Sequence, residues 1–264
     1  MKAIILAAGE GKRLRPLTNS KPKSMVKFFD KSILEQQISI MKKCGIDDII
    51  IVTGYKSELI KFPNIKYRNN SNFQNTNMVE TLFCAQDDLK GDVIISYADI
   101  LYEVNILKKL IDSNHDISVI IDKQWEKYWK KRFENPLNDA ETLKIDLHNN
   151  IYEIGQKTDN IDEIEGQFIG LMKFNPSGLK KLKNFYKKCK ETSITTGKNL
   201  LNPNLSFENS YMTDLLQGLI NEGYELKPVI IHGRWIELDS IDDYNLYKKL
   251  YQENKLTELI NLEK

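Results

Sequence analysis

The sequence contains few of the residues on which disulfide-rich, metal-cluster and membrane proteins depend. Its three cysteines, Cys44, Cys84 and Cys189, are far apart, which excludes a CxxC metal or redox motif and favours a reducing compartment. None of its three histidines stands at the spacing of a metal-ligand pair. The apolar run before Gly9 is too short for a signal peptide or a membrane span, so we expect a cytoplasmic protein that does not bind membranes.

The sequence also lacks an excess of either charge. It has 38 basic and 37 acidic residues, so no global charge would attract nucleic acid, and we expect no nucleic-acid partner. The most basic stretch, residues 179–188, carries leucine and aromatic residues at helical spacing, which indicates the solvated face of a helix. No internal repeat or low-complexity linker divides the 264 residues, so we predict a single domain.

A glycine-rich loop follows the first apolar run of the chain. Residues 3–8 predict a buried strand of a parallel sheet. Gly9 and Gly11 allow the backbone to approach a ligand closely, so that successive N–H groups can point at phosphate oxygens. Arg13 and Lys23 add positive charge. Neither the P-loop nor the dinucleotide-binding pattern fits this spacing, and we interpret the segment as a cradle for a triphosphate.

Strand and helix patterns alternate over residues 1–122. A capping box at Ser32 starts a helix, and apolar runs predict buried strands at residues 46–52 and 91–99. A strand, a helix and a second strand in this order are typical of the βαβ unit of a parallel sheet. Such sheets bind ligands at the carboxyl ends of their strands. The glycine-rich loop and Asp99 are both expected at that edge.

The pattern changes after residue 122. Residues 143–154 predict a hairpin, and residues 167–174 predict a further strand. Before them stand Trp125, Tyr128 and Trp129, which would suit a cage for a quaternary amine through cation–π contacts. The same residues lie at i, i+3 and i+4 of a helix, and a buried apolar stripe is the commoner explanation of that spacing, so we do not predict choline as the acceptor group.

The N-terminal motif resembles the signature of the nucleotidyltransferases that make nucleoside-diphosphate sugars and CDP-alcohols. The shared pattern is Leu-Ala-Ala-Gly-x-Gly-x-Arg-Leu-x-Pro-Leu-Thr, followed by Pro-Lys-x-Met. Later segments are similar to the cytidylyltransferase branch, which acts on small phosphorylated amines, and most closely to the CTP:phosphoglutamine cytidylyltransferases of bacterial capsule pathways. These segments are residues 75–79, 95–100, 132–133, 135–137, 139–144, 163–165 and 211–213.

The resemblance implies an α/β fold, with a Rossmann-like, mixed, mostly parallel sheet that has helices on both faces and an inserted acceptor-binding subregion. We expect one nucleotidyltransferase domain over residues 1–264. Residues 1–122 would form the nucleotide-binding core and residues 123–174 the acceptor-binding insertion. Residues 175–264 would complete the core and supply a second metal ligand.

The resemblance also implies the reaction and its residues. A phosphorylated amine or amino acid, with phosphoglutamine favoured, would attack the α-phosphorus of CTP directly and release pyrophosphate, with Mg²⁺ as cofactor. Asp99 and Asp239 would hold the metal, while Arg13 and Lys23 would act on the triphosphate as catalytic residues. The residues expected around the nucleotide are Leu6, Ala7, Ala8, Gly9, Gly11, Gly54, Asn75, Thr76, Asn77 and Ala98.

The acceptor needs cations for its phosphate and acids for its amine. The basic candidates are Lys144, Lys157 and Arg132. The acidic candidates are Glu165, Glu141 and Asp139.

Two other functions fit parts of the pattern. A sugar-1-phosphate nucleotidyltransferase would use UTP, TTP or GTP, but such enzymes usually have Glu-Lys-Pro where this chain has Gln156-Lys157-Thr158. A catalytically silent nucleotide sensor need not keep both Asp99 and Asp239. The sequence does not decide the oligomeric state, and a homodimer stays open.

Overall fold

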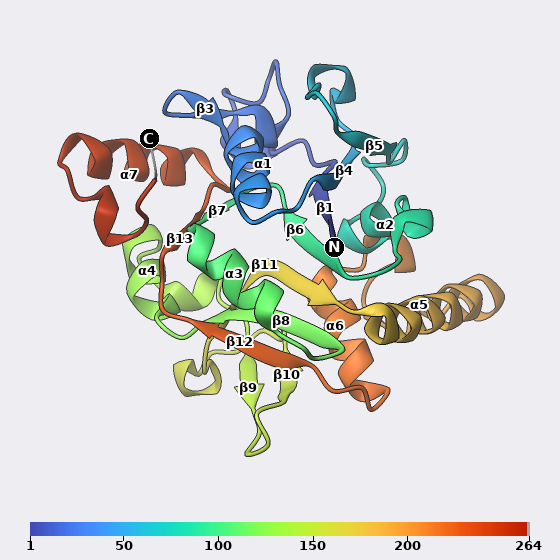
Figure 1. The fold of residues 1–264 in the computed structure, drawn as a ribbon. Helices are drawn as coiled ribbons and strands as arrows, with labels where there is room; N and C mark the ends of the chain where they lie inside the picture. The colour runs from blue at the N-terminus through green and yellow to red at the C-terminus, as the bar shows by residue number, and fades with distance from the viewer. Residues whose placement is uncertain (263–264) are drawn as a thin grey trace.

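A seven-stranded sheet forms the centre of the computed structural model, which describes residues 1–262 (Figure 1). Its strands, in spatial order, are β12 (Lys227–Ile231), β8 (Ile117–Asp122), β11 (Gln167–Phe174), β6 (Val93–Tyr97), β1 (Lys2–Ala7), β4 (Asp48–Thr53) and β5 (Lys66–Asn69). β11 runs antiparallel to β6 and β8, and the other neighbouring pairs are parallel. The predicted mixed, mostly parallel sheet is confirmed.

The central strands bury both of their faces, as their continuous apolar runs predict. Successive side chains of a strand point to opposite faces, and β1 accordingly contributes to two separate cores. Ala3, Ile5 and Ala7 belong to one core, while Ile4 and Leu6 belong to the other. The sheet therefore has a packed layer on each side.

Helices cover both of these faces (Figure 1). The first core includes residues of α1 (Ile33–Lys43), α3 (Val104–Asp112), α4 (Trp125–Arg132) and α7 (Ile241–Gln252). The second includes residues of α2 (Met78–Phe83), α5 (Pro176–Thr196) and α6 (Met212–Asn221). The predicted capping box of α1 is confirmed, since Glu35 N donates to Ser32 Oγ at 3.2 Å and Ser32 N donates to Glu35 Oε2 at 2.6 Å. The helical arrangement predicted for both faces is thus present.

Three small antiparallel sheets lie beside the main one. β9 (Leu143–Ile145) pairs with β10 (Ile151–Ile154), which confirms the predicted hairpin. β7 (Ile100–Tyr102) pairs with β13 (Trp235–Glu237), and β2 (Lys27–Phe28) pairs with β3 (Lys31–Ser32); the sequence patterns did not indicate these pairs. Short 3-10 helices occupy Lys12–Leu14, Lys23–Met25, Ser57–Leu59, Gln86–Asp88, Pro136–Asn138, Ile161–Glu163, Phe207–Asn209 and Leu256–Glu258.

The segment between β8 and β11 lies outside the main sheet, with the β9–β10 hairpin beside β12 (Figure 1). β11 itself, which we assigned to the acceptor-binding insertion, is an internal strand of the main sheet between β8 and β6. The insertion that we expected at residues 123–174 therefore contains a strand of the core. Among residues 1–262, no helix combines the length and the apolar character that crossing a membrane requires.

Candidate active site

A pocket of about 430 Å³ opens at the carboxyl ends of β1 and β6. Its wall contains the glycine-rich loop, Lys23, the residues that end both strands, and the loop before α2. Most of the residues predicted to surround the nucleotide line it, namely Leu6, Ala7, Ala8, Gly9, Gly11, Thr76, Asn77 and Ala98. The structure thus brings together segments from the beginning, the middle and the end of the chain, from Leu6 to Asp239, at the edge where α/β sheets bind ligands.

Gly54 and Asn75 do not line this pocket. A Cβ atom on Gly54 would lie 2.7 Å from Ala8 O and 2.9 Å from Phe73 Cβ, so glycine lets β4 pack directly against the glycine-rich loop. Asn75 Nδ2 donates to Asn72 Oδ1 at 2.9 Å. Gly54 thus shapes the pocket from outside, whereas the contact of Asn75 is with a residue that does not line the pocket either.

Gly11 brings the loop against Lys23. Its φ of +66° lies in the left-handed region, and a Cβ atom there would lie 2.7 Å from Lys23 Cβ. Both facts require glycine at this position. The loop and the lysine that follows it are therefore held in direct contact.

The Lys23 ammonium lies between two carboxylates. Its Nζ is 2.7 Å from Asp99 Oδ2 and 2.5 Å from Asp239 Oδ1. Arg13 Nη2 is 2.5 Å from the other oxygen of Asp239. Burial opposes the charge of Lys23, yet the surrounding carboxylates raise the pKa of the amine above its ordinary value. The predicted basic and acidic residues thus form one charged cluster.

A third carboxylate, which we did not predict, belongs to this cluster. Oxygen atoms of Asp99, Glu237 and Asp239 lie within 4.8 Å of one another. Burial and the two neighbouring aspartates raise the pKa of Glu237, and the Arg132 guanidinium opposes the rise. Glu237 stands two residues before Asp239 on an extended segment, so alternation along a strand would have placed both on one side.

The cluster fits a divalent cation. Mg²⁺ prefers hard oxygen ligands, and carboxylates are its usual protein ligands. Asp99 Oδ1 is buried without a hydrogen-bond partner, as expected for an oxygen that awaits a ligand. Among residues 1–262, Asp99, Glu237 and Asp239 accordingly form the group that suits a metal.

The fold holds Asp99 from two sides. Gln37 of α1 is fully buried, and its Nε2 donates to Tyr97 O at 2.8 Å and to Ile100 O at 2.5 Å. These carbonyls flank the turn that carries Asp99. On the other side, Leu238 N donates to Asp99 O at 2.8 Å, which extends the β7–β13 pairing. The two short strands that the sequence did not reveal therefore join the segments of both predicted metal ligands.

A second pocket, of about 240 Å³, adjoins the first. Arg13, Met78, Tyr97 and Glu237 line both. The wall of the second pocket also contains Asp139 and Glu141, two of the predicted acceptor-binding residues. It thus provides acidic groups next to the charged cluster.

Lys157 lies next to the two acidic residues of this second pocket, Asp139 and Glu141. Lys157 Nζ donates to Asp139 O at 3.2 Å. Burial, opposed by Lys157 and assisted by Asp139, raises the pKa of Glu141 to about 7. Three of the predicted acceptor-binding residues therefore lie together.

Lys144 and Glu165 lie elsewhere. Lys144 Nζ is 3.3 Å from Glu153 and 3.5 Å from Glu163, and it lines neither pocket. Glu165 accepts a hydrogen bond from Ile145 N at 3.2 Å. The structure does not bring these two residues to the predicted site.

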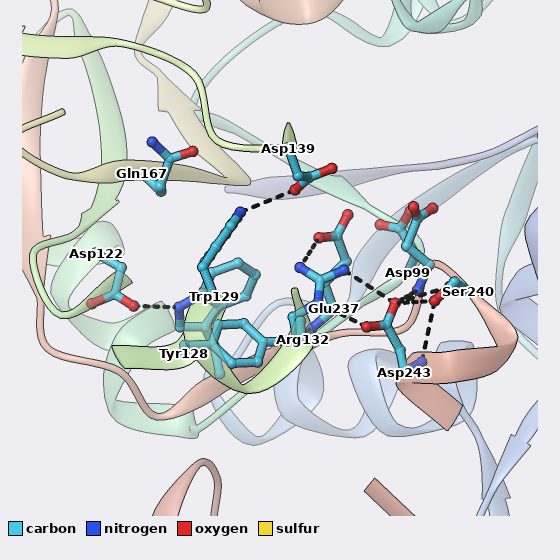
Figure 2. A network of polar contacts seen from close by, with 12 residues as sticks. Asp99, Asp122, Tyr128, Trp129, Arg132, Asp139, Gln167, Glu237, Ser240 and Asp243 are labelled. Carbon is cyan, nitrogen blue, oxygen red and sulfur yellow. Dashed lines mark hydrogen bonds and ion pairs between the residues drawn. The ribbon is translucent and has the colours of Figure 1, made fainter. Parts of the chain in front are cut away.

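The structure corrects the assignment of Arg132 as a ligand of the acceptor phosphate (Figure 2). Its side chain is 1% exposed. Its Nη1 donates to Glu237 Oε2 at 3.0 Å, and its Nε donates to Asp243 Oδ1 at 2.8 Å. The guanidinium is thus committed to carboxylates of the protein.

The aromatic residues of α4 pack in the core. Trp125, Tyr128 and Trp129 are all buried, and Trp125 Nε1 donates to Ile164 O at 3.2 Å. Trp129 touches the second pocket, where its Nε1 donates to Asp139 Oδ2 at 3.0 Å. Of the two interpretations, the buried stripe is the one that the structure supports.

Comparisons with known proteins agree with this architecture. The family model described as "Nucleotidyl transferase" matches residues 2–140. The chain is 43% identical over 254 residues to the CTP:phosphoglutamine cytidylyltransferase of Campylobacter jejuni, covering 92% of this chain and 97% of that protein. It is 37% identical over 107 residues to the choline-phosphate cytidylyltransferase of Streptococcus pneumoniae, covering 39% of this chain and 47% of that one.

Solved structures share the fold. The CTP:phosphocholine cytidylyltransferase of Streptococcus pneumoniae superposes with a TM-score of 0.69 at 21% identity, covering 95% of this chain and 98% of that one. The inositol-1-phosphate CTP transferase of T. maritima superposes with a TM-score of 0.71 at 20% identity, covering 98% of this chain and 97% of that one. With the family match over more than half of the sequence, these findings show that the chain belongs to the nucleotidyl transferase family of enzymes.

Proposed function

We propose that this enzyme is a Mg²⁺-dependent cytidylyltransferase that joins CTP to a small phosphorylated amine or amino acid, with phosphoglutamine as the favoured acceptor. The observation that carries the proposal is the 43% identity to a CTP:phosphoglutamine cytidylyltransferase over nearly the full length of both chains. The two adjoining pockets support it, because one reaction centre then has room for a nucleotide and for an acceptor.

The reaction requires no nucleophilic side chain. An oxygen of the acceptor phosphate attacks the α-phosphorus of CTP and forms a new phosphorus–oxygen bond. The bond between the α-phosphorus and the oxygen that bridges to the β-phosphorus breaks, and its electron pair leaves with pyrophosphate. The reactants are both anions, so the protein contributes mainly charge neutralisation and alignment.

The first pocket offers these contributions. Backbone N–H groups around Gly9 and Gly11 would bind phosphate oxygens, and Arg13 and Lys23 would neutralise the triphosphate and the leaving pyrophosphate. The carboxylate cluster of Asp99, Glu237 and Asp239 would hold Mg²⁺. Bound there, the metal supplies positive charge against the phosphate oxygens.

The second pocket offers a place for the acceptor. Asp139 and Glu141 would bind its ammonium group, while Arg13, which lines both pockets, would meet its phosphate. The amine and the phosphate of one small molecule would then be held at opposite ends of the second pocket. An acceptor without a cationic group would leave the acidic end unpaired.

Pyrophosphate release tests the proposal. The purified protein is incubated with Mg²⁺, with CTP, UTP, GTP or TTP, and with phosphoglutamine, phosphocholine, 2-aminoethylphosphonate or glucose 1-phosphate. We expect release with CTP and a phosphorylated amine. Release with another nucleotide and the sugar phosphate would instead identify a sugar-1-phosphate nucleotidyltransferase, and no release with any pair would favour a nucleotide sensor.

Asp99→Asn serves as the inactive variant of this assay, and Asp92→Asn is the matched control. Asp92 directly precedes the same strand, β6, at the end away from the pocket. We expect Asp99→Asn to abolish release without changing the circular dichroism spectrum, and Asp92→Asn to retain it. Full activity of Asp99→Asn would exclude this residue as a metal ligand.

A further inference from the structure

The buried guanidinium of Arg132 lies beside Glu237 of the carboxylate cluster (Figure 2). From its contacts we infer that Arg132 is a positioning residue, which holds Glu237 and the segment of Asp239 in the arrangement that a divalent cation requires. The inference rests on the proposed function, since it assigns a role in the same metal site. It concerns a residue of α4, more than 100 positions from both carboxylates in the chain.

Arg132 holds Glu237 directly. Its Nη1 donates to Glu237 Oε2 at 3.0 Å. Lys23 and Arg13 pair with the two aspartates of the cluster, whereas Glu237 pairs with Arg132. The guanidinium thus fixes the one carboxylate that the other two cations do not fix.

Arg132 also reaches the segment of Asp239 through Asp243. Its Nε and Nη2 donate to the two oxygens of Asp243 at 2.8 and 3.1 Å, a bidentate pair. The same Asp243 carboxylate accepts hydrogen bonds from Asp239 N at 3.1 Å and from Ser240 N at 2.9 Å. One side chain is therefore connected to two of the three carboxylates by separate routes.

The surroundings of Arg132 keep the guanidinium in one orientation. The rings of Tyr128, Trp129 and Phe133 lie 5.4, 5.4 and 5.0 Å from its central carbon. The Tyr128 hydroxyl accepts a hydrogen bond from Glu237 N at 2.8 Å, so the same helix also holds the backbone of this glutamate. A lysine keeps the charge but lacks the planar fork that binds two carboxylates at once.

Stability alone does not account for this arrangement. A buried ion network contributes little net stability compared with apolar residues of similar volume, because the charges must leave water. Packing alone does not require an arginine that contacts both Glu237 of the carboxylate cluster and Asp243 of the capping box of α7. Residues that orient metal ligands typically change metal affinity or activity by about 10- to 100-fold when they are replaced.

The test compares Arg132→Lys with Arg68→Lys. Arg68 also pairs with one carboxylate: its Nη2 donates to Asp88 Oδ1 at 3.1 Å and its Nε lies 2.8 Å from Asp88 Oδ2, but it lines neither pocket. Mn²⁺ binding is followed by the loss of the free-ion EPR signal, first with the protein alone and then with CTP, after subtraction of a protein-free titration. We expect Arg132→Lys to weaken Mn²⁺ binding and to lower kcat by about tenfold each, with a nearly unchanged KM for CTP. Arg68→Lys should behave as the wild type.

A double-mutant cycle separates positioning from general loosening of the fold. If Arg132 acts through Glu237, then adding Arg132→Lys to Glu237→Gln should weaken Mn²⁺ binding by less than it does in the wild type. Full additivity, or wild-type Mn²⁺ binding by Arg132→Lys, would overturn the inference. So would a wild-type protein that binds no Mn²⁺ under either condition.

Two further measurements keep the result interpretable. If Arg132→Lys does not fold by circular dichroism, Asp243→Asn tests the second route, because it keeps an oxygen acceptor but removes the charge that Arg132 binds. We expect weaker Mn²⁺ binding there as well, and wild-type binding by this variant would overturn the inference. A wild type that binds Mn²⁺ but does not use CTP would refute the proposed function and leave the role of Arg132 intact.

Discussion

Replacing Lys23 with methionine removes the ammonium group that lies between Asp99 and Asp239. Methionine has a similar length, so the change mainly removes charge. We expect three results from this one variant: slower catalysis, a lower free energy of unfolding, and stronger binding of a divalent cation in the absence of nucleotide.

The size of the stability loss follows from the geometry. Lys23 Nζ lies 2.7 and 2.5 Å from the two carboxylates, and its side chain is 14% exposed while theirs are each 13% exposed. Two unit charges about 4 Å apart interact by about 4 kcal/mol at the effective dielectric constant of such sites. Removing one partner of a buried pair costs about 3–5 kcal/mol. Arg13 still pairs with Asp239, so we expect a loss of about 3 kcal/mol at pH 7.

Lys23→Met should slow catalysis strongly. Removing one group that stabilises charge in a transition state typically lowers kcat by about 100- to 1,000-fold. Metal binding should change in the opposite direction, because the ammonium no longer competes for the carboxylates. Mg²⁺ should therefore raise the Tm of Lys23→Met by more than it raises the Tm of the wild type.

Urea unfolding, pyrophosphate release and thermal unfolding with and without Mg²⁺ measure the three effects. Lys27→Met is the matched control, since Lys27 is exposed and lines neither pocket. An unchanged unfolding free energy would refute the magnitude that we derive from the ion pairs. An equal Mg²⁺ shift in both proteins would show that the ammonium and the metal do not share one site.

Two other predictions concern groups around the cluster. Gln37→Leu leaves the carbonyls of Tyr97 and Ile100 without their buried donor, so we expect a loss of about 1–3 kcal/mol in urea unfolding and a lower kcat, which an unchanged kcat would contradict. Folding raises the pKa of Glu141 from 4.5 to about 7. The protonated carboxyl therefore contributes its full share to the free energy of unfolding below pH 4.5, and this share is lost as the pH rises through 7. Glu141→Gln should therefore gain up to about 3 kcal/mol relative to the wild type between pH 4.5 and 8, and a constant difference across that range would disprove the shift.

Local sequence patterns predicted most of the helices and strands of the fold. The strand at residues 167–174 and the capping box at Ser32 both depend on residues that are close in sequence, and the structure contains both where we predicted them. The position of β11 inside the main sheet was not predictable in this way. It depends on pairings with β8 and β6, which stand more than 40 residues earlier in the chain.

The sequence predicts the site residues that belong to a recognisable motif. It does not predict which residues from distant parts of the chain come into contact. Asp99 and Asp239 stand in segments that resemble a known family, and the structure brings them to one ammonium. Arg132 was misassigned, because a sequence shows that a residue is basic but does not show that two carboxylates from the end of the chain will bury it. The short pair β7–β13 gives no periodic signal over three residues, although it joins the segments of both predicted metal ligands.

The contact between Lys23 and Asp239 spans 216 positions of the chain, whereas the one between Lys23 and Asp99 spans 76. During synthesis the ribosome therefore delivers the glycine-rich loop and most of the sheet long before it delivers the last carboxylates. Closing a loop of this length costs conformational entropy, so we expect β13 to pair late in folding. The nascent chain thus contains the glycine-rich loop before it contains the last carboxylates of the cluster, and under the proposed function it would turn over nucleotide only after translation has passed residue 239.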